Sequence, residues 1–235
     1  MQYSRLPVSH PRGSRRNWEE RLRLPTRLEL YTHGLVERKI ATCGFLVWDV
    51  GNNRLLIEHG RQVAEGKQAT QILADHRALS MGLAWLIRQD LHRRRIVAHT
   101  DSDLVYDHLA LGRPVLRDSL WGLVQEARGP LKRFPQLTLE LIPLQDNHHA
   151  AQMAAAAYVA AQEERRRRRA AEVVGELYAG RPGLYWVGNR YQVDLEAGTC
   201  TCPDYKQMHT EEYPIRCKHL LAAAQLHHQE RKKKP

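Results

Sequence analysis

The chain has 235 residues, enough for one large domain or for a medium domain followed by a small one. Its formal net charge is +10 and its pI about 9.7, which favours a polyanionic partner, most commonly nucleic acid. No apolar run is long enough to cross a bilayer, and no charged-then-apolar leader opens the chain, so we expect a cytoplasmic protein with reduced thiols and no membrane partner.

Residues 1–26 mix arginine with proline, glycine and serine and show no sustained apolar period. We interpret this segment as a basic flexible arm. Arg12, Arg15 and Arg16 either contact phosphates or belong to a solvated tail.

Three strands are predicted after the arm. RLELYTHG, from Arg27, alternates and ends on a glycine, and KIATCGFLVWDV is rich in β-branched and aromatic residues. RLLIEHGRQV follows the turn signal Gly51-Asn52-Asn53, so we expect an antiparallel meander. Apolar residues at helical spacing in 69–89 then predict an amphipathic helix that packs on the sheet.

A fourth strand, RRIVAHTD, precedes a short helix for which Asp101 or Ser102 is the natural cap. The next helical stretch offers Trp121, Leu123 and Val124 to the core, and LTLELIP alternates as a fifth strand. This order of elements indicates an α/β layer fold with a mixed sheet.

The last long helix is predicted to begin near Asn147 and to continue to Gly180, because the segment is rich in alanine. We interpret residues 162–182 as a basic helical linker in which Arg165, Arg166, Arg167, Arg168 and Arg169 radiate around the axis, with phosphate contact as a second role. Residues 231–235 form a basic tail.

Four potential metal ligands lie close together near the end of the chain: Cys200, Cys202, Cys217 and His219. They form a C-x-C and a C-x-H pair separated by 14 residues. Three sulfurs and one imidazole complete tetrahedral zinc and leave no open position, so the pattern predicts a structural zinc site. Reduced free thiols or a disulfide are the alternatives, and other histidines could replace the fourth ligand: His209, His227 and His228.

These residues resemble the SWIM zinc finger, together with the alternating segment YWVGNRYQV, whose Gly188-Asn189 predicts a hairpin turn. The resemblance covers residues 183–230 and implies binding to nucleic acid or protein. A module this small needs the metal for most of its folding free energy. Lys206, Arg216 and Lys218 are candidate phosphate contacts, and Trp186 and Tyr191 form either a stacking surface or a small core.

Residues 27–161 resemble the ribonuclease H fold, which implies a mixed five-stranded sheet with helices. The matching stretches are Thr32-His33-Gly34, Ala74 to Leu79, Thr100-Asp101-Ser102 and Asn147 to Ala151. In that family these positions carry four carboxylates for two-metal hydrolysis. This chain keeps Asp101, shortens a glutamate to Asp75, and has His33 and Ala151 in place of the other two aspartates.

A histidine supplies neither the charge nor the bridging oxygens that paired magnesium ions require. We therefore interpret His33, Asp75 and Asp101 as a vestigial catalytic site, and expect a zinc-containing protein that binds RNA–DNA hybrid, double-stranded RNA or structured RNA. One alternative is a divergent nuclease in which these residues hold Mg or Mn, with Asp146 or His148 assisting. The other is an adaptor whose zinc module docks a protein partner.

Overall fold

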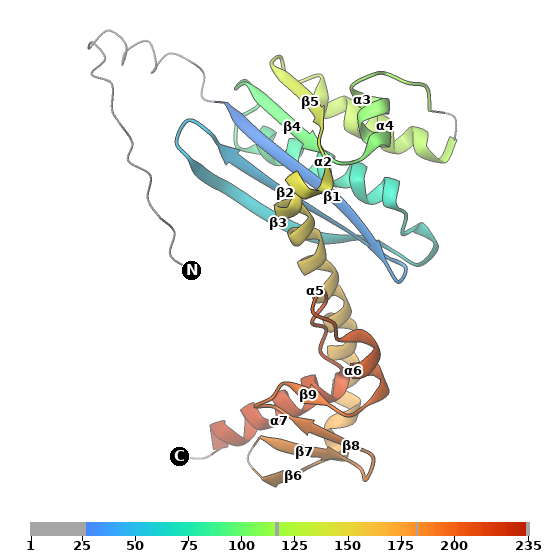
Figure 1. Cartoon of the computed structure of the whole chain (residues 1–235), viewed down its shortest axis with the longest axis vertical. Coiled ribbons are helices and arrows are strands. Elements are labelled where there is room, and N and C mark those ends of the chain that lie inside the picture. The colour runs from blue at the N-terminus through green and yellow to red at the C-terminus, as the bar shows by residue number, and fades with distance from the viewer. Residues whose placement is uncertain (1–26, 116–117, 182, 234–235) are drawn as a thin grey trace, which may run out of the picture.

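The computed structural model describes residues 27–115, 118–181 and 183–233. The expected basic arm, with Arg12, Arg15 and Arg16, lies outside the described residues. Figure 1 shows a long helix that runs from a large sheet to a small one. Within the described ranges, no helix combines the length and the apolar composition that crossing a bilayer requires.

The large sheet has five strands in the order β3-β2-β1-β4-β5. The first three pair antiparallel, and β4 and β5 continue from β1 in parallel. Their bounds are β1 Leu28–Glu37, β2 Ile40–Asp49, β3 Arg54–Glu65, β4 Ile96–Thr100 and β5 Leu137–Leu141. This confirms the expected mixed five-stranded sheet and the antiparallel meander.

β1 does not end at Gly34, as its sequence pattern suggested, but continues to Glu37. Gly34 does not form a turn; it allows the following helix to approach the strand closely. A Cβ atom there would lie 2.4 Å from the backbone nitrogen of Asp75, so the missing side chain lets the next helix begin against the strand.

Helices cover both faces of the large sheet, since alternate residues of β2 point to opposite sides and nearly all are buried. Helix α2 (Gln71–Arg88) packs on one face through Leu79, Leu83 and Leu86. Helix α5 (His148–Val173) crosses the other face, where Thr42 donates a hydrogen bond to the Ala154 carbonyl oxygen at 2.8 Å.

Helices α3 (Asp103–Leu109) and α4 (Asp118–Leu131) complete this layer, and Ser102 caps α3. The assignment of Trp121 to the core was wrong, because its side chain is 54% exposed. Val124 and Ala127 of α4 are fully buried, and Trp121 lies at the edge of the helix face that they define.

The small sheet has the order β6-β7-β8-β9, with bounds β6 Leu177–Arg181, β7 Leu184–Val187, β8 Tyr191–Asp194 and β9 Thr199–Cys200. Strands β7 and β8 confirm the predicted hairpin. The helix expected to reach Gly180 ends at Val173, because Leu177 instead pairs with Val187 as part of β6. Helices α6 (Pro203–Met208) and α7 (Lys218–Lys233) follow.

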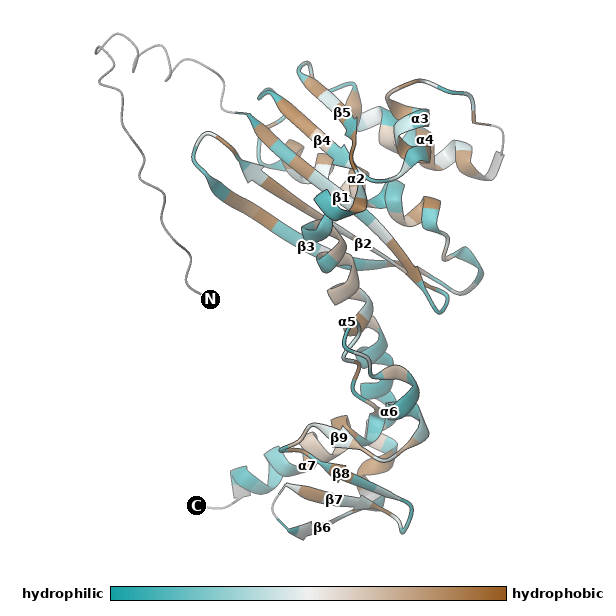
Figure 2. Ribbon diagram, viewed as in Figure 1, coloured by the Kyte–Doolittle hydropathy of each residue, from teal (hydrophilic) through white to brown (hydrophobic). Residues whose placement is uncertain are grey.

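Helix α5 belongs to both halves of the molecule. Near its middle, Tyr158 packs with Ile40 of the large sheet and with Met208 and Ile215 of the C-terminal module. Further along, Ala170 enters the core of the small sheet. Figure 2 shows that the helix is largely hydrophilic between the two sheets, so specific polar contacts supplement this small apolar junction.

Two ion pairs supply those contacts. Arg216 donates to the two carboxylate oxygens of Glu163 at 2.8 and 2.6 Å, and Arg166 donates to Asp204 at 3.1 and 3.2 Å. Arg166 is 9% exposed. The five arginines therefore do not all radiate into solvent, as a free linker would require, because Arg166 faces the zinc module.

Candidate metal centre and the His33–Asp101 cluster

The four predicted zinc ligands meet at the junction of β9, α6 and α7. Their ligand atoms all lie within 4.8 Å of one another and all four residues are buried. The Sγ atom of Cys200 lies 3.8 Å from Nδ1 of His219. Two sulfurs bound to one tetrahedral zinc are separated by roughly 3.8 Å, so these spacings fit the ion.

Backbone donors support the sulfur ligands. The Tyr205 N–H donates to Sγ of Cys202 at 3.3 Å, and the Leu220 N–H donates to Sγ of Cys217 at 3.4 Å. Hydrogen bonds from the Cys200 and Cys217 thiols lower the pKa of Cys202, which favours a thiolate there. Such donors stabilise the deprotonated ligands that zinc requires.

The three alternative histidines lie outside the cluster. Tyr205 stacks on His209, and Nδ1 of His227 lies 2.8 Å from the Tyr185 hydroxyl oxygen. Tyr191 stacks on His219 with ring centroids 5.1 Å apart, so it supports a ligand and does not form a free stacking surface. The Cys3His cluster is consistent with structural zinc.

His33 and Asp101 form the centre of a second polar cluster, where β1 and β4 lie side by side. Nδ1 of His33 lies 2.9 Å from Oδ2 and 3.1 Å from Oδ1 of Asp101. Asn147 donates to Oδ1 of Asp101 and to the Thr32 carbonyl oxygen, both at 2.8 Å. Both oxygens of this carboxylate therefore have partners from the chain itself.

Asp75 approaches the same strand from α2 but bonds to different groups. Its Oδ1 accepts from the Gly34 N–H at 3.0 Å and from Nε2 of Gln71 at 2.9 Å. Gln71 was not among the predicted site residues, although its position one helical turn before Asp75 places the two side chains on one face.

The two carboxylates have opposite electrostatic environments. Burial raises the pKa of Asp75 to about 6. Burial also opposes ionisation of Asp101, but the hydrogen bond and charge of His33 outweigh it and hold the pKa of Asp101 below its ordinary value. Asp101 therefore stays ionised at a lower pH than Asp75 does.

Asp146 and His148, the residues predicted to assist metal binding, are not part of this cluster. Asp146 and His148 line a separate cavity with Tyr31 and Trp48, and Nδ1 of His148 lies 3.3 Å from the Gln145 carbonyl oxygen. In the described part of the chain, the Cys3His group is the one place where three or more His, Cys, Asp or Glu ligand atoms are close enough to hold a metal.

The predicted phosphate contacts divide into two groups. Arg166 and Arg216 are held by Asp204 and Glu163, as described above. The rest lie nearer the surface and several pair with neighbouring glutamates, Arg165 with Glu65 and both Arg167 and Arg168 with Glu164. Arg169 is exposed and Lys218 half-buried.

The fold and these sites define a protein with a ribonuclease H-like domain followed by a SWIM zinc finger. The chain belongs to the reverse transcriptase-like family, which matches residues 32–157, more than half of its length. The SWIM zinc finger family matches residues 191–228. Both expected resemblances are thereby confirmed. No match was found among curated proteins.

Solved structures show the same fold for the first domain. RNase H1 from the halophilic archaeon Halobacterium salinarum is 22% identical over 56% of this chain and 97% of its own, with a TM-score of 0.50. The N-terminal RNase H domain of a Mycobacterium tuberculosis protein is 22% identical over 56% of this chain and 98% of its own, with a TM-score of 0.51. LC11-RNase H1, isolated from compost and solved in complex with an RNA/DNA hybrid, is 21% identical over 55% and 95%, with a TM-score of 0.50.

The raised pKa of Asp75 leads to a prediction about the stability of the fold. Its folded pKa of about 6 exceeds the ordinary value of 3.8, so the folded chain binds more protons between these pH values. Stability from this group is therefore full below about pH 4 and is lost as the pH rises through about 6, by on the order of 3 kcal/mol. We expect Asp75→Asn to raise the free energy of unfolding at pH 7 by roughly 1–3 kcal/mol.

Urea unfolding of both proteins at a series of pH values checks this. Asp90→Asn is the matched control, since the Asp90 side chain is 86% exposed, and it should keep the wild-type slope between pH 4 and 6. If the difference in unfolding free energy between the wild type and Asp75→Asn stayed constant from pH 4 to 6, the buried carboxylate would not be the group that titrates.

Proposed function

We propose that this chain is a zinc-containing nucleic-acid-binding protein whose ribonuclease H-like domain holds RNA–DNA hybrid, double-stranded RNA or structured RNA without cleaving it. Three findings support binding: membership of the reverse transcriptase-like family, the net charge of +10, and a fold shared with LC11-RNase H1, which was solved with an RNA/DNA hybrid. Proteins that read such duplexes do so through their shape and 2′-hydroxyls.

The hydrogen bonds of the Asp101 carboxylate are the observation that supports binding without cleavage. His33 reaches both carboxylate oxygens and Asn147 reaches one, so groups of the chain occupy the positions where a divalent cation would bind. A hard cation must displace these donors before it can use the oxygens. Imidazole in place of a carboxylate also removes negative charge from the site.

The rest of the cluster agrees with this interpretation. Two-metal hydrolysis requires two ions about 4 Å apart, clamped by shared carboxylates. Here the alanine at position 151 has no ligand atom, and Asp75 directs its Oδ1 to the Gly34 backbone and Gln71. Mg or Mn would be a cofactor only if hydrolytic activity remains.

A second candidate function, a divergent metal-dependent nuclease, is favoured by one feature. The fold brings His33, Asp75 and Asp101 together near the point where β1 and β4 lie side by side, although the three are far apart in sequence. Rotation of the His33 side chain would free the Asp101 carboxylate for one softer ion such as Mn. Cleavage and binding must therefore be measured together.

Phosphate contacts are assigned to the arginines on the outer part of α5 and to the zinc module. Arg165, Arg167, Arg168, Arg169 and Lys218 keep solvent access, and their pairs with surface glutamates are weak. We assign a different role to Arg166 and Arg216: their ion pairs fix the zinc module against α5. Two binding modules joined by one helix gain affinity through effective concentration.

The first test measures retention and cleavage of a labelled RNA–DNA hybrid by the purified protein in manganese, with Asp101→Asn in parallel. We expect both proteins to bind and neither to cleave. One phosphate contact from each of these five solvent-accessible residues predicts roughly a five-hundred-fold loss of affinity between about 50 and 200 mM salt. Asp146→Asn, which removes a carboxylate from the neighbouring cavity, is the matched control.

Cleavage by the wild type that is lost in Asp101→Asn but kept in Asp146→Asn would establish the nuclease instead. If the protein retains neither hybrid nor structured RNA, a protein partner of the zinc module becomes the better explanation. Co-purification of a stoichiometric protein after nuclease treatment would then identify it.

A further inference from the structure

The outer face of the small sheet carries an aromatic pair that the zinc module does not use for its core. Side chains alternate across β7, so Tyr185 and Val187 enter the core while Trp186 points the other way. Tyr178 of β6 is directly opposite Trp186, and Gln192 of β8 is opposite Trp186 on its other side. These three side chains form one row across the sheet, which we call the Tyr178–Trp186 face.

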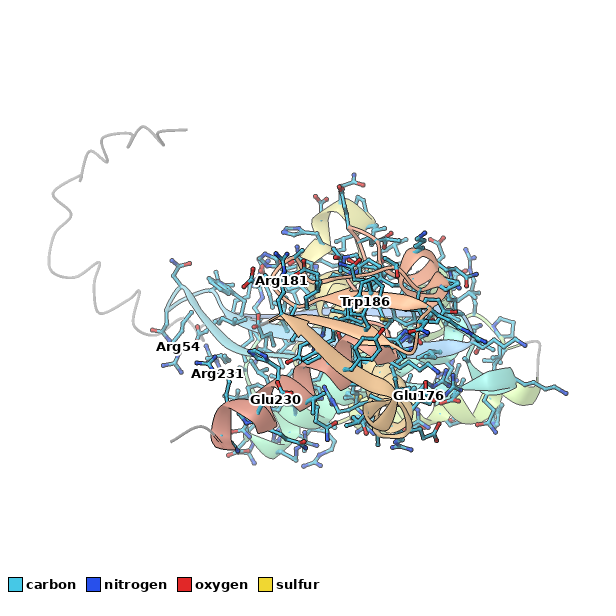
Figure 3. All side chains as sticks on the ribbon, turned by 90° about the horizontal axis from the view of Figure 1, so that it is seen from below. Arg54, Glu176, Arg181, Trp186, Glu230 and Arg231 are labelled. Carbon is cyan, nitrogen blue, oxygen red and sulfur yellow. The ribbon has the colours of Figure 1, made fainter. Side chains whose placement is uncertain are left out.

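Both rings are held in place, and the Tyr178 ring is exposed while the Trp186 ring is partly exposed. Tyr178 is 47% exposed and its hydroxyl donates to Oδ1 of Asn189 at 3.3 Å. A Cβ atom on Gly180 would lie 3.5 Å from Nε1 of Trp186, so the indole lies along β6 where a glycine leaves room. In Figure 3 the small sheet faces the viewer, with Trp186 and Arg181 on it and no other described element in front.

Positive charge flanks this face. Arg181 ends β6 and Arg190 precedes β8, both are exposed, and among the described residues neither has an ion-pair partner. Asp194 is the acidic residue on β8, and its Oδ1 accepts from the backbone N–H groups of Glu196 and Ala197. Glu176 lies away from Arg181 in Figure 3. Aromatic rings between unpaired guanidinium groups are complementary to bases joined by phosphates.

We propose that the Tyr178–Trp186 face stacks on unpaired bases of a single-stranded segment, while Arg181 and Arg190 contact its phosphates. This assignment rests on the proposed nucleic-acid binding and deepens it by naming the class of strand that the second module takes. Bases in a duplex are already stacked on one another, so the Tyr178 ring and the partly exposed Trp186 ring gain contact only from an unpaired strand. Stacking also tolerates any base sequence, because every base has a π-face.

The test uses the full-length zinc-loaded protein and compares three labelled probes by fluorescence anisotropy. The first is a blunt RNA–DNA hybrid, the second is the same hybrid with a single-stranded RNA tail, and the third carries an abasic tail of equal length. We expect the base-containing tail to tighten binding relative to the blunt hybrid, and the abasic tail to recover little of that gain. This comparison separates stacking from phosphate attraction.

Two variants and one control assign the gain to this face. Tyr178→Ala and Trp186→Ala should each weaken binding of the tailed probe by roughly five- to a hundred-fold and leave the blunt probe unchanged. Trp121→Ala is the matched control, since it removes an exposed tryptophan from α4, and it should change neither. Because Tyr178 is half exposed, its substitution keeps the comparison valid even if Trp186→Ala lowers zinc content.

The outcomes separate this assignment from the wider function. A tail that gives no gain, or an abasic tail that gives the full gain, overturns the stacking role while hybrid binding stands. If this face binds a protein instead, the tail adds nothing, and that outcome likewise overturns the stacking role. If the blunt hybrid does not bind but the hybrid with the RNA tail does, and Tyr178→Ala abolishes that binding, the stacking face stands and the duplex-binding function fails.

Discussion

Replacing Cys217 by serine is expected to unfold the C-terminal module and leave the five-stranded sheet folded. Cys217 is 1% exposed and belongs to a core of twelve buried residues among those that the structure describes, three of which are the cysteine ligands. Zinc binding contributes on the order of 10 kcal/mol to the folding of small zinc modules, and serine is a poor ligand for the ion. The large sheet has its own core around Leu79 and Leu83, which contains none of the ligands.

Zinc content by atomic absorption and amide hydrogen exchange of residues 177–230 measure this directly. Cys43→Ala is the matched control, because it removes the buried thiol of β2, far from the cluster in the sequence, and should keep the zinc content of the wild type. Chelation of the wild type should reproduce Cys217→Ser. Full protection of residues 177–230 without zinc would mean that the junction with α5 is sufficient to fold the module.

Replacing Gly44 by alanine is expected to destabilise the large sheet by roughly 3 kcal/mol, because the site is overpacked. A Cβ atom there would lie 2.3 Å from the Ala150 carbonyl oxygen and 2.6 Å from the Ala154 nitrogen, both backbone atoms of α5. The helix would have to move away from β2. Asn147 at its start would then lose its 2.8 Å bond to Asp101.

Urea unfolding followed by circular dichroism gives the change in free energy. Gly122→Ala is the matched control: this glycine lies on the exposed side of α4, with nothing within 4 Å of an added Cβ atom. Alanine should stabilise that helix by about 0.5–1 kcal/mol. Similar effects at both glycines would mean that α5 does not pack on β2 as closely as the contact distances require.

The local patterns of the sequence were sufficient for the strands of the large sheet and for the metal centre. Alternation and β-branched composition predicted the five strands of the large sheet and the β7–β8 hairpin, whereas β6 was expected to be helix and β9 was not predicted. Helical spacing predicted α2, because one side of that helix lies in a core. The zinc ligands form two pairs, Cys200 with Cys202 and Cys217 with His219, and each pair is fixed by neighbouring residues. Only the closing of the loop between the pairs depends on distant contacts.

The errors arose where a residue's role depends on a partner far along the chain. Nothing near Arg166 in sequence indicates that it pairs with Asp204, and nothing near Gly34 indicates that Asp75 will lie against it. The helix α5 also ends earlier than predicted because of a distant partner. Alanine-rich composition favours helix, but the gain from pairing Leu177 with Val187 exceeds that local preference.

The sequence by itself determined the mixed sheet, the four candidate zinc ligands and the presence of His33 and Ala151, since these follow from residue identity and from the order of short periodic segments. Only the tertiary structure decided that His33 pairs with Asp101, that α5 fixes the zinc module through Glu163, and that Tyr178 joins Trp186 on an open face. The physical reason is that side-chain chemistry is set locally, whereas its partners are brought near only when the chain folds.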